Sequence, residues 1–249
     1  MHNPNPTAAL LIIGNEILSG RTKDANLAWL GEQLAAMGIG LREVRVVPDV
    51  PAEIIDGVNA LRQRFDVVFT TGGIGPTHDD ITTENVAKAF GVPVIRHPDA
   101  ETALRAHYKP EDINEARLKM ANVPEGASLV ANPVSAAPGY KIGNVYVFAG
   151  VPRIMQAMFE NIRHELKTGE PILSRAVWTY LTEGTVAEGL TAIQHASPAV
   201  DIGSYPMIRD GKLGCSLVGR ATDAKKLEEA VTLIKTLISQ LGGTVIAEE

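Results

Sequence analysis

Short, continuous apolar runs alternate along this chain with longer stretches in which apolar residues recur every three or four positions. The continuous apolar run 8–13 predicts a strand that is buried on both faces of a parallel sheet, and 41–47 and 66–70 predict the second and third strands. The periodic stretches 24–37 and 51–64 predict the helices that connect these strands. This alternation predicts an α/β domain with a mostly parallel sheet and helices on both of its faces.

The same domain continues to about residue 167 with a less regular pattern. Helical spacing predicts further helices at 81–90, 98–107 and 111–121, and another that starts at Gly150-Val151-Pro152 and runs to about 167. Residues 92–95 predict a short strand, and 139–142 with 145–148 predict a hairpin whose two-residue turn is Gly143-Asn144. Residues 122–138 hold three prolines and little periodicity, so we expect mostly loop there.

The pattern changes after residue 169. Strands are predicted at 174–182, 201–208, 212–220 and 244–247, and helices at 185–194 and 223–241. Their order, β-α-β-β-α-β, is that of a small α+β domain. We therefore predict two domains, 1–169 and 170–249. The second has 7 Lys and Arg against 10 Asp and Glu, which disfavours RNA binding, so we expect a structural role or a dimer contact.

Composition and charge argue against several classes of protein. The net charge of −6 and the pI of about 5.6 argue against non-specific binding to nucleic acid or to a membrane surface. The single cysteine, Cys215, excludes an intrachain disulfide. The N-terminus has no signal-peptide pattern, and no apolar run approaches the roughly 20 residues of a membrane span. We expect a cytoplasmic protein without a nucleic-acid or membrane partner.

Residues 70–84, Thr-Thr-Gly-Gly-Ile-Gly-Pro-Thr-His-Asp-Asp-Ile-Thr-Thr-Glu, carry the clearest chemistry. They place a glycine turn between a strand and a helix, where the backbone can approach a phosphate and the helix N-terminus offers free N–H groups. Asp79 and Asp80 would repel a bare phosphate, so they indicate a divalent cation such as Mg²⁺ or Mn²⁺ shared with it. The alternative role for either aspartate is an N-cap of the helix, and we expect one of them to cap. The segment lacks the Lys-Ser or Lys-Thr of a P-loop.

Two further loops should lie at the same edge of the sheet, because each also adjoins the end of a predicted strand. Residues 14–20 follow the first strand and supply Glu16 as a candidate metal ligand and Ser19 as a candidate phosphate ligand. Pro138-Gly139 and Gly150 flank the later hairpin. Asp24 is expected to cap the helix that follows it, and Thr82 either binds phosphate or simply occupies a first helical turn.

The candidate site residues fall into two groups. The candidate catalytic and metal-binding residues are Glu16, Asp79 and Asp80. The candidate substrate- and phosphate-binding residues are Gly14, Ser19, Asn26, Thr71, Gly72, Gly73, Gly75, Thr77, Thr82, Glu84, Pro138, Gly139 and Gly150.

Three of these segments, in order, carry a family resemblance. Residues 70–84 resemble the signature T-T-G-G-x-G-P-T-x-D-D-x-T-x-E of the CinA (competence/damage-inducible protein A) N-terminal region, part of the MoaB/Mog-like molybdopterin-binding domain family. Residues 13–20 with Asp24 and Asn26 are similar to its first motif, and Asn132, residues 137–139 and residues 150–152 to its third. The likeness covers about residues 8–167, and the tail 172–249 is similar to the small KH-like domain that follows it.

The resemblance implies a three-layer MoaB/Mog-like fold and a pocket for a small nucleotide or pterin phosphate. It implies metal-dependent hydrolysis of a nucleotide pyrophosphate such as ADP-ribose or FAD, with Mg²⁺, Mn²⁺ or Co²⁺ and K⁺ as a helper ion. The alternatives are a protein that binds or adenylylates molybdopterin, and a non-catalytic nucleotide-binding module. A homodimer or trimer is plausible from the family.

The sequence departs from the family pattern in two respects, a missing domain and a changed motif. Long CinA proteins carry a C-terminal amidase domain, and this sequence stops before it, so we do not expect that activity. The third motif usually reads Pro-Gly-Val-Pro-x-Glu, whereas here it reads Ala149-Gly150-Val151-Pro152-Arg153-Ile154. Any role of that glutamate is therefore in doubt.

Overall fold

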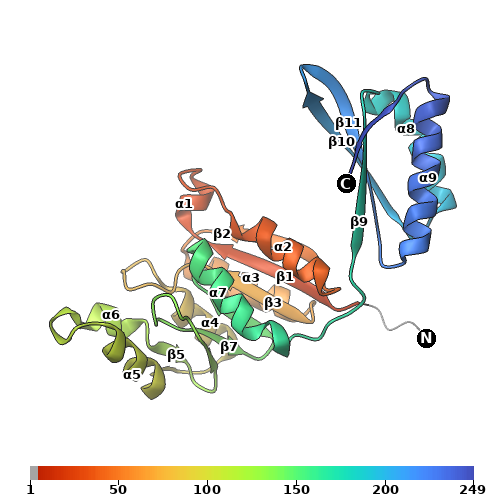
Figure 1. Cartoon of the computed structure of the whole chain (residues 1–249). Helices are drawn as coiled ribbons and strands as arrows, with labels where there is room; N and C mark the ends of the chain where they lie inside the picture. Colours follow the sequence, from red (N-terminus) through yellow and green to blue (C-terminus); the bar gives the residue numbers. More distant parts are fainter. Residues whose placement is uncertain (1–4) are drawn as a thin grey trace. The chain divides into compact units, whose positions relative to one another are not determined.

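The computed structural model describes residues 5–249 and divides them into two compact units (Figure 1). The first holds the described residues up to Gly169 apart from Ala35–Gly38, and the second holds Ala35–Gly38 and Glu170–Glu249. Within the described residues, no helix has both the length and the apolar character needed to cross a bilayer.

The first unit is built on a six-stranded sheet with the order β2-β1-β3-β8-β7-β6. Its strands are β1 (Thr7–Ile13), β2 (Gly40–Val47), β3 (Val67–Thr71), β6 (Ser128–Val130), β7 (Gly139–Ile142) and β8 (Val145–Phe148). Strands β2, β1, β3 and β8 pair in parallel, whereas β7 and β6 are antiparallel additions at one edge. The expectation of a mostly parallel sheet with a hairpin at 139–148 is confirmed.

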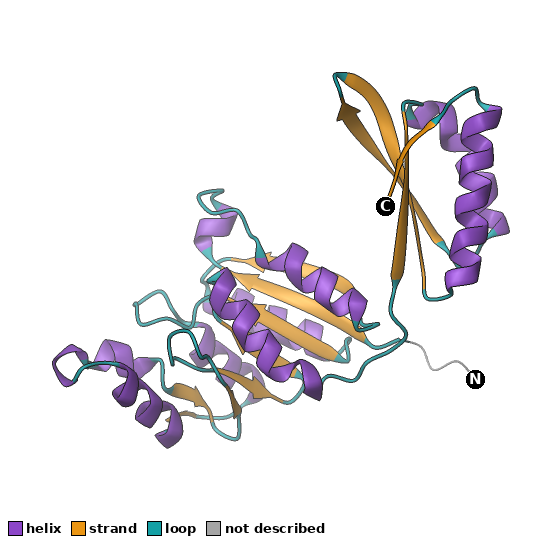
Figure 2. Cartoon of the chain, in the orientation of Figure 1, coloured by secondary structure: helices purple, strands orange, loops and turns teal. Residues whose placement is uncertain are grey.

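Helices cover both faces of this sheet (Figure 2). Helices α3 (Pro51–Arg62) and α4 (Thr82–Phe90) pack Val58 and Val86 against Val68. Helices α2 (Asn26–Ala36) and α7 (Pro152–Ile162) lie on the opposite face, where Phe159 contacts Phe69 with ring centroids 5.9 Å apart. Because consecutive residues of β3 enter two different cores, all five residues of the strand are buried, including Thr70 and Thr71.

The peripheral segment between β3 and β7 differs in part from the sequence prediction. It contains α5 (Pro98–His107), a 3₁₀ turn η1 (Pro110–Asp112), α6 (Glu115–Lys119) and a ribbon of β4 (Val94–Arg96) with β5 (Asn122–Pro124). The helix expected at 111–121 is interrupted because the Asn114 side chain caps α6 by accepting from the Arg117 N–H. The expected loop at 122–138 contains β5 and β6, and the helix expected to reach about 167 ends at Ile162.

The second unit has the predicted β-α-β-β-α-β order. It comprises β9 (Leu173–Thr179), α8 (Glu183–Ala196), β10 (Asp201–Arg209), β11 (Lys212–Ala221), α9 (Ala224–Gln240) and β12 (Val245–Glu248). The sheet is antiparallel with the order β10-β11-β9-β12. Asp210 and Gly211 form the β10–β11 turn with φ of 53° and 73°, as a two-residue hairpin turn requires.

Candidate functional site

Loops from distant parts of the sequence meet at the carboxyl edge of the parallel strands. A Cβ on Gly72, after β3, would collide with the backbone oxygen of Ile13 at the end of β1. A Cβ on Gly150, after β8, would lie 3.3 Å from the Gly72 Cα. The Asn26 amide donates to the Gly150 carbonyl oxygen at 2.8 Å. The first, second and third motifs therefore adjoin one another, and these glycines are needed for their close approach.

Two hydrogen bonds from Thr82 join the glycine turn to the start of α4. Gly72 and Gly73 have φ of 100° and 68°, which side-chain-bearing residues rarely adopt. The buried Thr82 hydroxyl donates to the Gly72 carbonyl at 3.0 Å, and the Thr82 N–H donates to the Gly73 carbonyl at 2.9 Å. The Thr82 hydroxyl is therefore engaged in holding the turn.

Thr77 holds the Asp80 carboxylate by hydrogen bonds, and neither Asp79 nor Asp80 caps helix α4. Asp80 Oδ2 accepts from the Thr77 N–H at 2.8 Å and from the Thr77 hydroxyl, and this carboxylate lies where a side chain on Gly75 would stand. The N-cap position of α4 is Ile81, without a side-chain cap, so the expected aspartate cap is wrong. Asp79 is exposed, and the Thr77 hydroxyl, the Asp79 N–H and the charges of His78 and Lys119 lower the pKa of its carboxyl.

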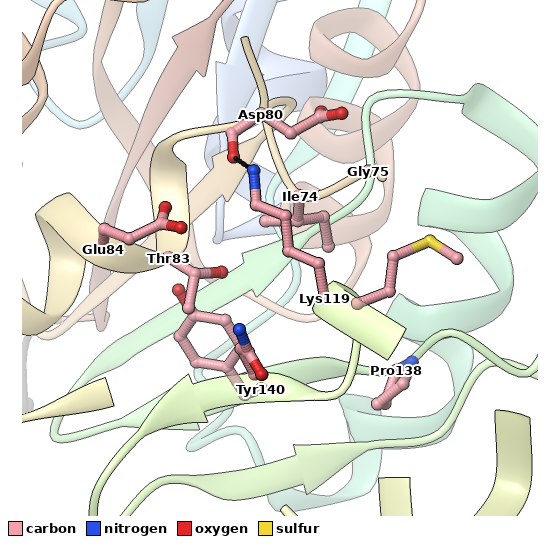
Figure 3. Close-up of a pocket in the computed structure, with 10 residues that line it drawn as sticks. Ile74, Gly75, Asp80, Thr83, Glu84, Lys119, Pro138 and Tyr140 are labelled. Atoms are coloured by element: carbon pink, nitrogen blue, oxygen red, sulfur yellow. Dashed lines mark hydrogen bonds between the residues drawn. The ribbon is translucent and has the colours of Figure 1, made fainter. Parts of the chain in front are cut away.

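Lys119, at the end of α6, reaches this loop from 39 residues further along the chain. Its ammonium group donates to the Asp80 carbonyl at 2.7 Å (Figure 3). It also donates to the Thr77 carbonyl at 3.0 Å. These bonds place a positive charge beside the glycine turn. The sequence pattern gave no signal for Lys119, because α6 belongs to the irregular segment between β3 and β7.

Lys119 and Asp80 line a small pocket of about 10 Å³, the space of roughly one water molecule. The other lining residues are Ile74, Gly75, Thr83, Glu84, Met120, Asn122, Pro138 and Tyr140 (Figure 3). Glu84 Oε2 is shielded from solvent without a hydrogen-bond partner among the described residues. The buried Tyr140 hydroxyl faces Thr83 and Glu84, but neither provides a well-formed hydrogen bond. Burial raises the pKa of Tyr140, so it remains a neutral donor.

Three more buried polar atoms in this part of the first unit lack partners among the described residues. They are Oδ1 of Asn26, whose amide nitrogen binds Gly150, and the Oγ1 atoms of Thr70 and Thr71, the last two residues of β3. Buried polar atoms in proteins are nearly always satisfied by protein, water or ligand. Their concentration at this edge is a feature of a ligand site.

The three candidate metal ligands, Glu16, Asp79 and Asp80, do not form a preformed metal site. Glu16 lies in the short helix α1 (Asn15–Leu18), where its exposed carboxylate folds back over Gly14. Among residues 5–249, no group of three or more His, Cys, Asp or Glu side chains is placed to hold a metal ion. The Ser19 hydroxyl donates to the Glu16 carbonyl at 3.2 Å. Metal binding by Glu16, Asp79 and Asp80 therefore remains a prediction.

Gly139 and Asp24 have structural roles in the first unit. A Cβ on Gly139 would collide with the Val147 carbonyl oxygen, so this glycine is needed for the pairing of β7 with β8. Pro138, beside it, does line the pocket. Asp24 accepts from the Leu27 N–H at 2.8 Å, as expected for a residue that caps α2.

Residues 9–168 match the family model described as "Probable molybdopterin binding domain". The chain belongs to this family. Residues 171–245 match a second model, "FAD synthase, middle domain". The MoaB/Mog-like fold that the signature implied is thereby confirmed, and it lies in the unit that carries the candidate site.

Similar proteins agree with this assignment. A protein of Aeropyrum pernix is 33% identical, with 98% of each chain covered. A crystal structure of CinA from Thermoplasma acidophilum, described as of unknown function, has a TM-score of 0.62 and 34% identity over 66% of this chain and 99% of its own. A probable FAD synthase of Caenorhabditis elegans is 30% identical over 94% of this chain, but this chain spans only 50% of it.

Proposed function

We propose that the first unit binds a nucleotide pyrophosphate such as ADP-ribose or FAD at the β3–α4 loop and hydrolyses it. The observation that carries the proposal is the glycine turn after β3, where the N–H groups of Gly73, Ile74 and Gly75 have no acceptor among the described residues and the Lys119 ammonium lies beside them. The similarity to a probable FAD synthase and to an FAD synthase middle domain supports a flavin or adenine nucleotide as the ligand.

The glycine turn is the proposed phosphate cradle. The N–H groups of Gly73, Ile74 and Gly75 donate no hydrogen bond to any other described residue, so they are free to bind oxygen atoms. The Lys119 ammonium beside them offsets negative charge. Fixed donors of this kind stabilise the charge that develops on phosphoryl oxygens without having to reorganise.

The proposed reaction is a hydrolysis. The oxygen of water forms a bond to one phosphorus, the bond from that phosphorus to the bridging oxygen breaks, and the bridging oxygen leaves with the other phosphate. ADP-ribose would give AMP and ribose 5-phosphate, and FAD would give AMP and FMN. The carboxylates of the described residues form no three-ligand group, so the assay below compares each divalent ion with EDTA.

A molybdopterin-binding role is the second candidate, and the description of the matching family favours it. Such a protein would bind the pterin phosphate in the same cradle and would transfer AMP to it from ATP. Equilibrium binding of molybdopterin, followed by ATP-dependent formation of its adenylate, separates this role from hydrolysis.

The test is AMP release from ADP-ribose and from FAD by the full chain, with EDTA, Mg²⁺, Mn²⁺ or Co²⁺, and with or without K⁺. We expect release with at least one pair of substrate and ion. Lys119→Met should lower kcat/KM at least about tenfold, because it removes a charge beside the phosphate. The control is Lys109→Met, at an exposed position outside the pocket, which should not change it. Tight nucleotide binding without turnover under every condition would leave a non-catalytic binding module.

A further inference from the structure

One face of the sheet in the second unit carries no helix. Cys215 and Leu217 of β11 pair with Thr179 and Val177 of β9, and all four side chains are buried. The apolar cluster that includes Val177, Cys215 and Leu217 also contains the buried residues of α8 and α9, so both helices lie on this side (Figure 1). Because neighbouring side chains of a strand point to opposite faces, the residues between them form a second face that no helix of this unit covers.

Aromatic side chains gather on this open face. Tyr205 of β10, Ser216 of β11 and Trp178 of β9 occupy one row across three adjacent strands. Tyr205 is 47% exposed, and its ring lies over Gly203, where a Cβ would come within 3.0 Å of it. The Trp178 indole nitrogen has no hydrogen-bond acceptor among the described residues. The exposed Tyr205 ring is therefore accessible for stacking, whereas Trp178 is half-buried and its indole nitrogen is shielded from solvent.

Among the described residues, lysine and arginine side chains of this unit form ion pairs on the helix side of the sheet but not on its open side. On the helix side, each of Arg175, Lys225, Lys226 and Lys235 forms an ion pair with a carboxylate. On the open side, Arg209 and Lys212 lie over the rings of Trp178 and Tyr180, at 5.3 and 5.4 Å. Arg209, Lys212 and Arg220, all exposed, form no ion pair with another described residue. Positive charge that is not neutralised thus lies beside the aromatic rings.

We propose that this open face is a second nucleotide site, separate from the pocket of the first unit. The base stacks on the exposed Tyr205 ring, and Arg209 and Lys212, which lie over the rings of Trp178 and Tyr180, bind the phosphate. Aromatic rings on an open antiparallel sheet are a general means of stacking bases, and stacking tolerates any base because each has a π-face. Arg209 matches a phosphate in geometry as well as charge, because its guanidinium can donate two parallel bonds.

The charge of the whole unit favours a free nucleotide over a nucleic-acid strand. Residues 170–249 contain 7 Lys and Arg against 10 Asp and Glu, so a long polyanion would meet net repulsion. Binding of a strand depends on many phosphate contacts, whereas this face offers three unpaired cations. That number suits the phosphates of one nucleotide.

The experiment follows Trp178 fluorescence in the full chain. The sequence has two tryptophans, so Trp29→Phe leaves Trp178 as the only emitter. Titration with AMP, ADP and FAD should quench its emission in a saturable manner, and the affinity should fall as salt concentration rises. Arg209→Gln with Lys212→Gln should weaken this binding about tenfold or more.

The matched control removes the same charge from the other side of the same unit. Arg175→Gln with Lys235→Gln changes net charge equally but affects residues paired on the helix side, so the quench should keep its affinity. Circular dichroism confirms folding of each variant. AMP release by the first unit should be unaffected in all of them, which separates failure of this site from failure of the proposed function.

Three results would overturn the proposal. The first is the absence of a saturable quench in the folded Trp29→Phe protein. The second is equal loss of affinity in both double variants, which would make net charge the cause. The third is tighter binding of an eight-nucleotide oligoadenylate than of AMP, with the same dependence on Arg209 and Lys212, because that would assign the face to a single strand.

Discussion

The Thr82 hydroxyl donates a 3.0 Å hydrogen bond to the carbonyl oxygen of Gly72, ten residues earlier in the chain. This buried bond joins the first turn of α4 to the glycine turn that follows β3. Residues of both segments, Ile74 and Gly75 of the turn and Thr83 and Glu84 of the helix, line the same pocket. A preformed cradle avoids an ordering cost when ligand binds.

Replacing Thr82 with valine should therefore damage both stability and binding. The change preserves shape but leaves the buried Gly72 carbonyl unsatisfied, at a cost of about 1–3 kcal/mol in the free energy of unfolding. Urea denaturation measures this cost. Thr102→Val, at an exposed hydroxyl that donates within its own helix, should change stability by less than about 0.5 kcal/mol. Similar effects of the two variants would contradict the role given to Thr82.

Gly73→Ala and Gly91→Ala form a matched pair, because both glycines have φ of 68°. At Gly91 a Cβ meets nothing within 4 Å, so only the backbone strain of about 1 kcal/mol is expected. At Gly73 the Cβ would collide with the Thr82 hydroxyl, so the loss of stability should be at least about twice as large. Nucleotide binding should weaken only in Gly73→Ala. Equal stability losses would mean that the turn is not packed as described.

Tyr140→Phe should lower nucleotide affinity without lowering the stability of the fold. It removes a buried hydroxyl without a well-formed partner, so the free energy of unfolding should stay constant or rise by up to about 1 kcal/mol. Nucleotide affinity should fall if that hydroxyl binds ligand. Tyr146→Phe is the control, because its hydroxyl contacts Glu165 at 3.4 Å and lies outside the pocket. A variant of Tyr140 that binds normally would remove this residue from the site.

Asp66 should give the first unit a pH-dependent contribution to stability. Its carboxylate accepts from the Thr7 N–H at 2.7 Å and the Thr7 hydroxyl at 2.8 Å, and these bonds lower its pKa below the ordinary 3.8. A lowered folded pKa means that the contribution is present above the unfolded pKa and is lost as pH falls through the folded value. Because Asp66 is exposed, Asp66→Asn should cost at most about 1 kcal/mol at pH 7 and progressively less below pH 4. A pH-independent cost in urea titrations would contradict this assignment.

Hydrophobic periodicity predicted the helices and strands whose own buried residues form part of a core. Strand β3 and helix α4 were predictable because Val68, Phe69 and Val86 are buried with helical or strand spacing. The strands β5 and β6 were not, because each has only three residues and forms by pairing with a distant strand. Their residues carry no local periodicity from which they could be predicted.

The site was predictable to the extent that it consists of backbone turns. Glycines such as Gly72 and Gly150 marked the loops, and the loops do meet. Side chains that reach in from elsewhere were missed, as with Lys119, which binds two carbonyl groups of the loop. Nor could sequence reveal that Asp80 would bind Thr77 instead of capping α4, since both geometries suit an aspartate before a helix.

The central claim is that the free N–H groups of the β3–α4 turn bind the phosphates of a nucleotide. The most direct measurement is the change in the backbone amide resonances of ¹⁵N-labelled protein on titration with ADP-ribose. The account predicts that the resonances of Gly73, Ile74 and Gly75 shift together with one saturation curve, and that Gly73→Ala abolishes this response. Saturable binding that leaves these three amides unchanged would contradict it.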